Sequence, residues 1–132
     1  MKRLLLDTSA YSAFKRGHPG IVERMAEADE LVVCPVVMGE LLSGFRRGSR
    51  LRANLEELEE FLSVDRVLVL PIDDDTAECY AVIHAGLARA GTPVPTNDLW
   101  IAASAMRLGL AVLTLDAHFE RIPQIRVERL AS

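Results

Sequence analysis

Short runs of apolar residues alternate along the chain with longer segments whose apolar residues recur at helical spacing. Five of the short runs predict buried strands, at residues 3–6, 30–34, 67–70, 111–115 and 125–129. The segments between them predict helices over 9–16, 19–28, 35–45, 50–62, 73–90 and 97–108, with one further helical turn at 117–121. This alternation predicts an α/β fold in which helices flank a central, mainly parallel sheet of four to five strands.

Polar residues and glycines mark the predicted helix ends. Ser9, Ser49 and Thr96 stand where N-caps are expected, and Asp75 with Glu78 has the spacing of a capping box. The acidic run at 73–75 is interpreted as the start of a helix, because negative charge is favourable at a helix N-terminus. Helix ends are predicted at Gly17, Gly91 and Gly109.

Length and composition are those of an ordinary globular protein. The chain has 132 residues, half of them hydrophobic and 26% charged, which predicts a single domain over residues 1–132. No apolar run reaches the length of a membrane span, and the run at 4–6 is too short for a signal peptide, so we expect a cytoplasmic protein. Cys34 and Cys79 lie far apart in apolar surroundings, which predicts two free core thiols.

Acidic residues outnumber basic ones, 19 to 15, but four arginines cluster in one segment. The formal net charge of −4 argues weakly against a general nucleic-acid binder. Arginine is nevertheless a good bidentate ligand of phosphate. The alternative interpretation of the arginine-rich segment 46–52 is a solvated hinge between two helices. The cluster consists of Arg46, Arg47, Arg50 and Arg52.

Four acidic residues each interrupt an apolar segment. Asp7 and Asp116 follow two predicted strands, and the carboxyl ends of parallel strands open onto one edge of a sheet. Glu40 lies inside an apolar helix, and Asp98 lies in the first turn of another. Taken singly, Glu40 could face solvent and Asp98 could serve only the helix dipole.

A common site for the four carboxylates has a definite chemistry. Like charges packed together raise one another's pKa values, and a cation relieves the repulsion. Oxygen ligands suit Mg²⁺ or Mn²⁺ rather than zinc or copper. A metal held in this way lowers the pKa of a bound water and neutralises charge on a phosphoryl oxygen.

The segments "LLLDTSAY", "VVMGELLSG", "TNDLWIAASA" and "VLTLDAHFERI" resemble the four acidic motifs of PIN-domain ribonucleases, most closely those of the VapC toxins of toxin–antitoxin pairs. The resemblance covers the whole chain in the right order, and no acid of the pattern is missing. It implies a PIN-like fold and a Mg²⁺-dependent endoribonuclease, with Mn²⁺ as the alternative metal. The expected reaction is hydrolysis of structured RNA (tRNA or rRNA), which leaves 5′-phosphate and 3′-hydroxyl ends and inhibits translation.

The resemblance also implies roles for individual residues and partners. The catalytic and metal-binding acids would be Asp7, Glu40, Asp98 and Asp116, with Asp7 and Asp98 as direct metal ligands. The partners would be a VapB-type antitoxin, an RNA and a second copy of the chain, with Arg46, Arg47, Arg50 and Arg52 contacting RNA or antitoxin. Supporting roles fall to Thr8 and Ser9 beside Asp7, to Asn97 near metal-bound water or phosphate, and to Thr114.

The sequence is also compatible with functions of other classes. A receiver-like phosphoacceptor domain has acids at strand ends too, but it needs a lysine near the late strands, and none follows Lys15. A PIN-like module that binds without catalysis and a PIN-type enzyme that cuts DNA both stay open. The sequence gives no catalytic signature for His84, His118 or Trp100, which we expect to be a partly buried structural histidine, a loop histidine and a packing residue.

Overall fold

The computed structural model describes residues 1–132 and contains a five-stranded sheet in the order β3-β2-β1-β4-β5. All four strand pairs are parallel, which confirms the predicted fold class. The strands are β1 (Arg3–Leu6), β2 (Glu30–Val33), β3 (Val67–Val69), β4 (Ala111–Thr114) and β5 (Arg126–Arg129).

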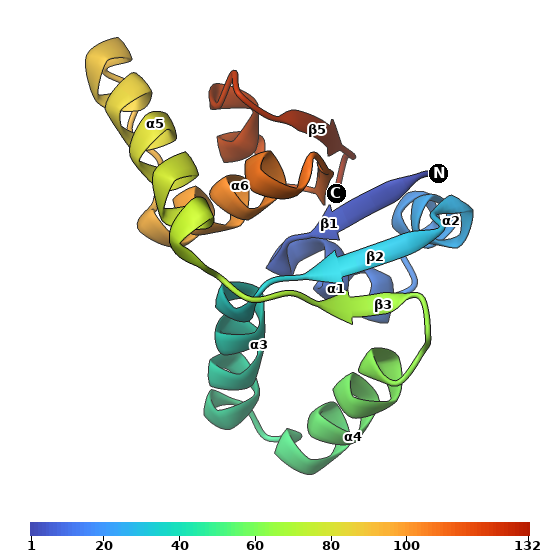
Figure 1. The fold of residues 1–132 in the computed structure, drawn as a ribbon. Helices are drawn as coiled ribbons and strands as arrows, with labels where there is room; N and C mark the ends of the chain where they lie inside the picture. The colour runs from blue at the N-terminus through green and yellow to red at the C-terminus, as the bar shows by residue number, and fades with distance from the viewer.

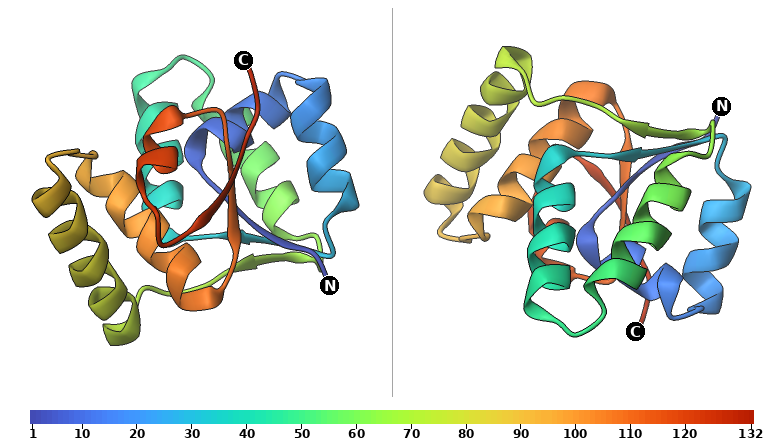
Figure 2. Two further views of the ribbon diagram at one scale, coloured as in Figure 1. Left: turned by 90° about the horizontal axis from the view of Figure 1, so that it is seen from above. Right: turned by 90° about the horizontal axis from the view of Figure 1, so that it is seen from below.

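Helices connect these strands and cover the sheet. Figure 2 shows the strands in the middle of the molecule, with the α5–α6 pair on one side and α2 on the other. Figure 1 shows α3 and α4 beside the β3 edge. The helices are α1 (Thr8–Lys15), α2 (Pro19–Glu27), α3 (Pro35–Arg47), α4 (Leu51–Leu62), α5 (Asp74–Ala90) and α6 (Thr96–Leu108), and a 3₁₀ helix, η1 (Ala117–Arg121), follows β4.

The three inner strands are buried on both faces. All but the first residue of β1 and of β2, and the whole of β4, are shielded from solvent. This explains why these strands are continuous apolar runs rather than alternating ones, because helices cover both sides of a parallel sheet. The edge strands are more open, as Val69 in β3 is 46% exposed.

Three predicted N-caps and the capping box are wrong. The residues that cap α1, α4 and α6 are Asp7, Arg50 and Pro95 instead of Ser9, Ser49 and Thr96. Asp7 follows β1 directly, and its carboxylate accepts a hydrogen bond from the Ala10 backbone N–H, so α1 begins without an intervening loop. Thr96 is already helical, because the extended backbone ends at Pro95. Nothing in the structure explains why Arg50 rather than Ser49 caps α4.

The acidic run does start a helix, as predicted, but with different capping partners. Asp73 accepts hydrogen bonds from the backbone N–H and hydroxyl of Thr76, and the capping box joins these two residues rather than Asp75 and Glu78. Thr76 is completely buried, so its polar groups need a partner within the protein. Asp73 is that partner, and the helix begins directly after it.

Four further predictions concern single side chains. Cys34 and Cys79 are both free, but only Cys34 is buried and Cys79 is half-buried. His84 is exposed, which contradicts its expected partial burial. The Trp100 ring is half-buried and stacks on Tyr80, with the ring centroids 4.2 Å apart, as expected of a packing residue. None of the helices combines the length and apolar character that crossing a bilayer requires.

Candidate active site

The strand order reverses direction between β1 and β4. From β1 the chain moves outward to β2 and then β3, and it returns to the other side of β1 to form β4 and then β5. In open parallel sheets ligands bind at such a switch point, outside the carboxyl ends of the strands. Asp7 follows β1 and Asp116 lies two residues after the end of β4, so both acids stand at this point.

Asp7 is a buried carboxylate held by several donors. Only 4% of the residue is exposed. Its Oδ1 accepts from the Ala10 backbone N–H and the Ser9 hydroxyl, both at 2.8 Å, and its Oδ2 accepts from the Thr114 hydroxyl at 2.6 Å. Burial raises its pKa above the ordinary aspartate value, although these hydrogen bonds oppose the shift.

The Ser9 and Thr114 hydroxyls join Asp7 to the end of β4. The Leu115 backbone N–H donates to Ser9 Oγ at 3.0 Å, and the Asp116 backbone N–H donates to Thr114 Oγ1 at 2.8 Å. Each hydroxyl therefore accepts a hydrogen bond from a backbone N–H of the segment after β4 and donates a hydrogen bond to the Asp7 carboxylate. This arrangement sets the position of Asp116 relative to Asp7.

Glu40 projects from α3 and is held from two other elements. The Thr8 hydroxyl of α1 donates to Glu40 Oε1 at 2.5 Å, and the Asn97 side-chain amide of α6 donates to Oε2 at 3.2 Å. Thr8 was expected to orient Asp7 together with Ser9, but its hydroxyl bonds to Glu40 instead, because the first turn of α1 directs it toward α3. The amide of Asn97 likewise orients Glu40 in the structure.

Asp98, Asp116 and His118 form the tightest group. One ligand atom from each residue lies within 4.8 Å of the other two. His118 Nδ1 is 3.2 Å from Asp98 Oδ2 and 3.1 Å from Asp116 Oδ1. Sequence reasoning placed His118 in a loop and gave it no role. The missed signal is its spacing from Asp116, whose carboxylate caps η1 by accepting from the His118 backbone N–H and so keeps the ring close.

The four acids share one electrostatic environment. Burial raises the pKa of Asp98 most, and the charges of Asp116 and Glu40 raise it further, whereas the hydrogen bond with His118 opposes the shift. Asp116 also raises the pKa of Asp7. The structure thus brings Asp7, Glu40, Asp98 and Asp116 together, although Asp7 and Glu40 lie outside the group that Asp98 and Asp116 form with His118.

This donor set fits a hard divalent cation. Carboxylate oxygens dominate it, and carboxylate and carbonyl oxygens suit Mg²⁺ and Mn²⁺. Asp98 and Asp116 present oxygens close enough to share one ion. A cation there would offset the mutual repulsion that raises the pKa of Asp98.

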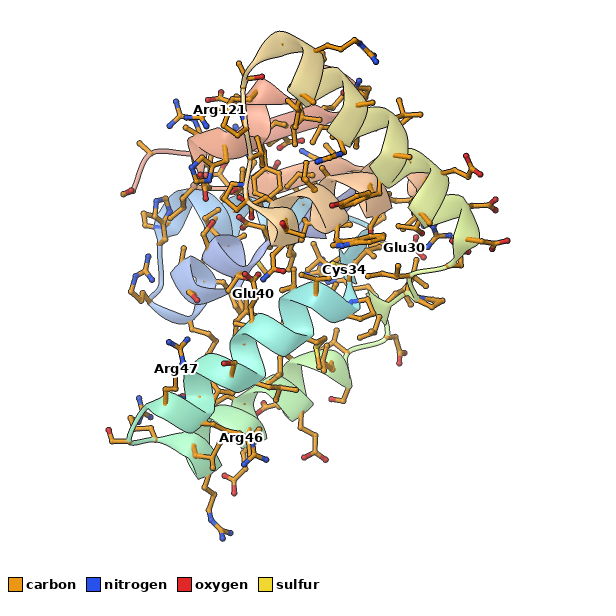
Figure 3. The ribbon with its side chains drawn as sticks, turned by 90° about the vertical axis from the view of Figure 1, so that its left-hand side faces the viewer. Glu30, Cys34, Glu40, Arg46, Arg47 and Arg121 are labelled. Atoms are coloured by element: carbon orange, nitrogen blue, oxygen red, sulfur yellow. The ribbon has the colours of Figure 1, made fainter.

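The clustered arginines do not reach the acids as a group. Only Arg47 lines the hollow that also contains Thr8, Glu40 and Asn97. Figure 3 shows Arg47 extending to the same side of α3 as Glu40, whereas Arg46 extends away from it. Arg50 lies 3.9 Å from Glu57, and Arg52 lines a separate hollow on α4.

Comparison with known proteins decides the family. A family model described as the PIN domain matches residues 4–125, a segment that contains all four acids. The chain is 33% identical over 129 residues to ribonuclease VapC4 of Mycobacterium tuberculosis, covering 96% of both chains. The chain belongs to the PIN-domain family and to its VapC ribonucleases.

Other VapC proteins and their structures agree with this assignment. The tRNA(fMet)-specific endonuclease VapC of Salmonella typhimurium is 35% identical over 131 residues, covering 97% of this chain and 98% of the relative. A crystal structure of DNA-bound VapBC from the same organism matches 98% of both chains with a TM-score of 0.86 and 35% identity. VapBC-1 from nontypeable Haemophilus influenzae matches with a TM-score of 0.85 and 26% identity, covering 96% and 97% of the two chains.

The Thr114 hydroxyl should be the main support of the buried Asp7 carboxylate. Thr114→Val keeps the shape of the side chain but leaves Asp7 Oδ2 with only the 3.0 Å contact to the Ser9 hydroxyl and leaves the Asp116 N–H without its acceptor, so we expect a loss of roughly 1–3 kcal/mol in the free energy of unfolding. The loss should grow as pH rises, because the substitution raises the pKa of Asp7 further and the ionised form is the one that needs the donor. Denaturant unfolding at several pH values, without metal, measures both effects.

Thr114→Ser is the matched control. It keeps the hydroxyl and removes one buried methyl group, so its cost should be about 1 kcal/mol and independent of pH. Equal pH dependence in the two variants would contradict the assigned role of the hydroxyl.

The raised pKa of Asp98 predicts a pH-dependent instability without metal. A group whose folded-state pKa is raised supports folding below its unfolded pKa, and this support is lost as pH rises through the folded value. Asp98→Asn should therefore match wild type near pH 3.8 and become the more stable protein toward neutral pH. Thermal unfolding in chelator across this range tests the sign, and a variant less stable at neutral pH would refute it.

Proposed function

We propose that this protein is a Mg²⁺-dependent endoribonuclease toxin, with Mn²⁺ as the alternative metal, and that it hydrolyses phosphodiester bonds in structured RNA and so inhibits translation. The observation that carries the proposal is the convergence of four carboxylates at the switch point of a VapC-type PIN fold. A binding module has no need of this costly arrangement, because uncompensated like charges destabilise the fold.

The sequence resemblance implied Asp7 and Asp98 as the direct metal ligands, but we place the ion between Asp98 and Asp116, because their carboxylate oxygens lie close enough to share it. Asp7 and Glu40 complete the acidic environment from β1 and α3, and they could act through water or hold a second ion once RNA is present. When bound, the cation would neutralise charge on the phosphoryl oxygen and favour deprotonation of the attacking water.

The remaining residues position the acids without neutralising them. Ser9, Thr114 and the Ala10 backbone N–H hold Asp7, and Thr8 with Asn97 holds Glu40. These donors are uncharged, so they orient the carboxylates and leave their negative charge available to a cation. His118 lies between Asp98 and Asp116 and restricts the orientation of both carboxylates.

The names of the relatives suggest the substrate class and the partner. The Salmonella typhimurium relative is named a tRNA(fMet)-specific endonuclease, so we propose tRNA as the first substrate to test, with rRNA as the second. The structural relatives are VapBC structures. We propose that a VapB-type antitoxin binds and inhibits this protein, in an assembly that contains two toxin chains. The site of action would be the cytoplasm, where these RNAs function.

Cleavage of RNA by the purified protein is the direct test of this function. Incubated with total tRNA, wild type should give discrete fragments with Mg²⁺ or Mn²⁺ and none with chelator. Asp7→Asn, Glu40→Gln, Asp98→Asn and Asp116→Asn should each lower the rate by at least the roughly 10- to 100-fold loss that is typical of residues supporting a metal.

Asp74→Asn is the matched control, because Asp74 is an exposed acid at the start of α5, outside the site. Its rate should equal that of wild type. Activity that survives all four substitutions would show that a different site, or a contaminant, cuts the RNA. Activity on DNA but not RNA would favour the interpretation of the chain as a DNA-cutting enzyme.

Metal binding should also be visible without any substrate. A ligand that binds only the folded state stabilises it by about 2.7 kcal/mol when its free concentration is about 100-fold above Kd. Titration with Mg²⁺ or Mn²⁺ should therefore raise the Tm of wild type by several degrees and leave the Tm of Asp98→Asn nearly unchanged. An equal shift in both proteins would place the ion elsewhere.

A further inference from the structure

A hollow of about 610 Å³ lies beside the acidic cluster, between the first turns of α1 and α6 and one face of α3. Thr8, Glu40 and Asn97 form the end near the acids. Gly39 lies beside Glu40 at this end, and Ser43 and Arg47 continue the α3 wall away from the acids. One end of the hollow therefore carries a carboxylate of the site, and the other end carries a cation.

Arg47 reaches this hollow because of its spacing from Glu40. Seven residues are close to two helical turns, so both side chains project from the same face of α3 about 10 Å apart along the axis. Figure 3 shows the two on one side of the helix and Arg46 directed elsewhere.

The guanidinium of Arg47 has no carboxylate partner. Its Nε makes a long hydrogen bond of 3.4 Å to the Ser43 carbonyl, and the remaining N–H groups have no protein acceptor. Glu40 forms no ion pair with it, because the two residues lie about 10 Å apart along the helix axis and the Glu40 carboxylate is turned toward Thr8 and Asn97. The other cations nearby differ in this respect, since Lys15 and Arg50 both lie against Glu57 at 3.3 and 3.9 Å.

Gly39 is the second observation that points to a ligand in the hollow. A glycine inside a helix costs about 1 kcal/mol relative to alanine. No packing demands it here, because a Cβ built at Gly39 would meet nothing within 4 Å. The missing side chain leaves the α3 wall open beside Glu40, at the end of the hollow near the acids.

We propose that this hollow is a subsite for the RNA backbone, in which Arg47 binds a phosphate that flanks the one at the acidic cluster. The proposal rests on the proposed function and deepens it. An RNA strand carries phosphates at regular intervals, so one phosphate at the acids and a nearby one at Arg47 match the two ends of the hollow. Arginine suits this role, because its planar fork binds phosphate bidentately.

The hollow has room for the backbone of one RNA strand. Its volume falls in the range of pockets that hold small molecules, which is the scale of nucleotides rather than of a double helix. The RNA would thus present an unpaired stretch, such as a loop, at the bond that is cut. An acidic antitoxin side chain is the competing occupant of the Arg47 end.

A binding experiment separates this inference from the catalytic one. A short fluorescein-labelled single-stranded RNA is titrated, with Mg²⁺ present and at several salt concentrations, into Asp98→Asn protein, in which cleavage is suppressed. Adding Arg47→Ala should weaken binding several-fold at low salt and lower the slope of log affinity against log salt by about 0.7, the value expected for one lost phosphate contact in a single strand. Arg46→Ala should leave both unchanged.

RNA variants identify the phosphate itself. In a series of RNAs that each carry one uncharged methylphosphonate linkage, one flanking linkage should weaken binding to the Arg47 protein as much as Arg47→Ala does. The same RNA should cause no further loss in Arg47→Ala, because the pair has already been broken.

Filling the hollow gives an independent readout. Gly39→Gln should raise helix stability yet weaken RNA binding, whereas Gly44→Gln, at an equally open position outside the hollow, should change only stability. Equal salt slopes for Arg47→Ala and Arg46→Ala would overturn the subsite, whether or not wild type cuts RNA. A lowered slope in a protein that cuts no RNA would support the subsite and refute the nuclease.

Discussion

The burial of the Asp7 carboxylate at the end of β1 is the constraint on which the rest of the site depends. A carboxylate taken out of water is costly unless donors surround it, and here a backbone N–H and two hydroxyls do so. The two hydroxyls, of Ser9 and Thr114, also accept hydrogen bonds from backbone N–H groups of the segment after β4. Satisfying Asp7 therefore brings Asp116 to the same edge of the sheet, and through η1 it brings His118 as well.

Two helices bring the other two carboxylates to this edge, and a side-chain amide connects these helices. Asp98 lies in the first turn of α6 and Glu40 lies on α3, and Asn97 links the two helices by donating to Glu40. Burial first, and then the charges of neighbouring acids, raise the pKa of Asp98 and of Asp7, so the protein retains an unfavourable interaction at this edge of the sheet. Functional sites often keep such strain because a ligand relieves it. A bound cation would therefore stabilise this edge of the sheet.

The net charge of the chain does not by itself suggest that it binds a polyanion such as RNA. The net charge is −4, and two basic side chains near Arg47, those of Lys15 and Arg50, are paired with Glu57. What matters for such a partner is the local arrangement: a site that attracts cations and an unpaired guanidinium at the opposite end of one hollow. Local charge of both signs replaces the broad positive surface found in general nucleic-acid binders.

The sequence by itself determined the sheet, its parallel strands, and the four acids that interrupt apolar segments, because burial on both faces and helical periodicity leave direct traces in the order of residues. It could not determine the partners of those acids. Thr8 holds Glu40 rather than Asp7, Asp73 rather than Asp75 caps α5, and His118 joins Asp98 across twenty residues. It also grouped four arginines that the helices direct to different surfaces, of which only Arg47 faces the hollow beside the acids. Side-chain direction and contacts between elements depend on how the helices pack, and this information exists only in the tertiary structure.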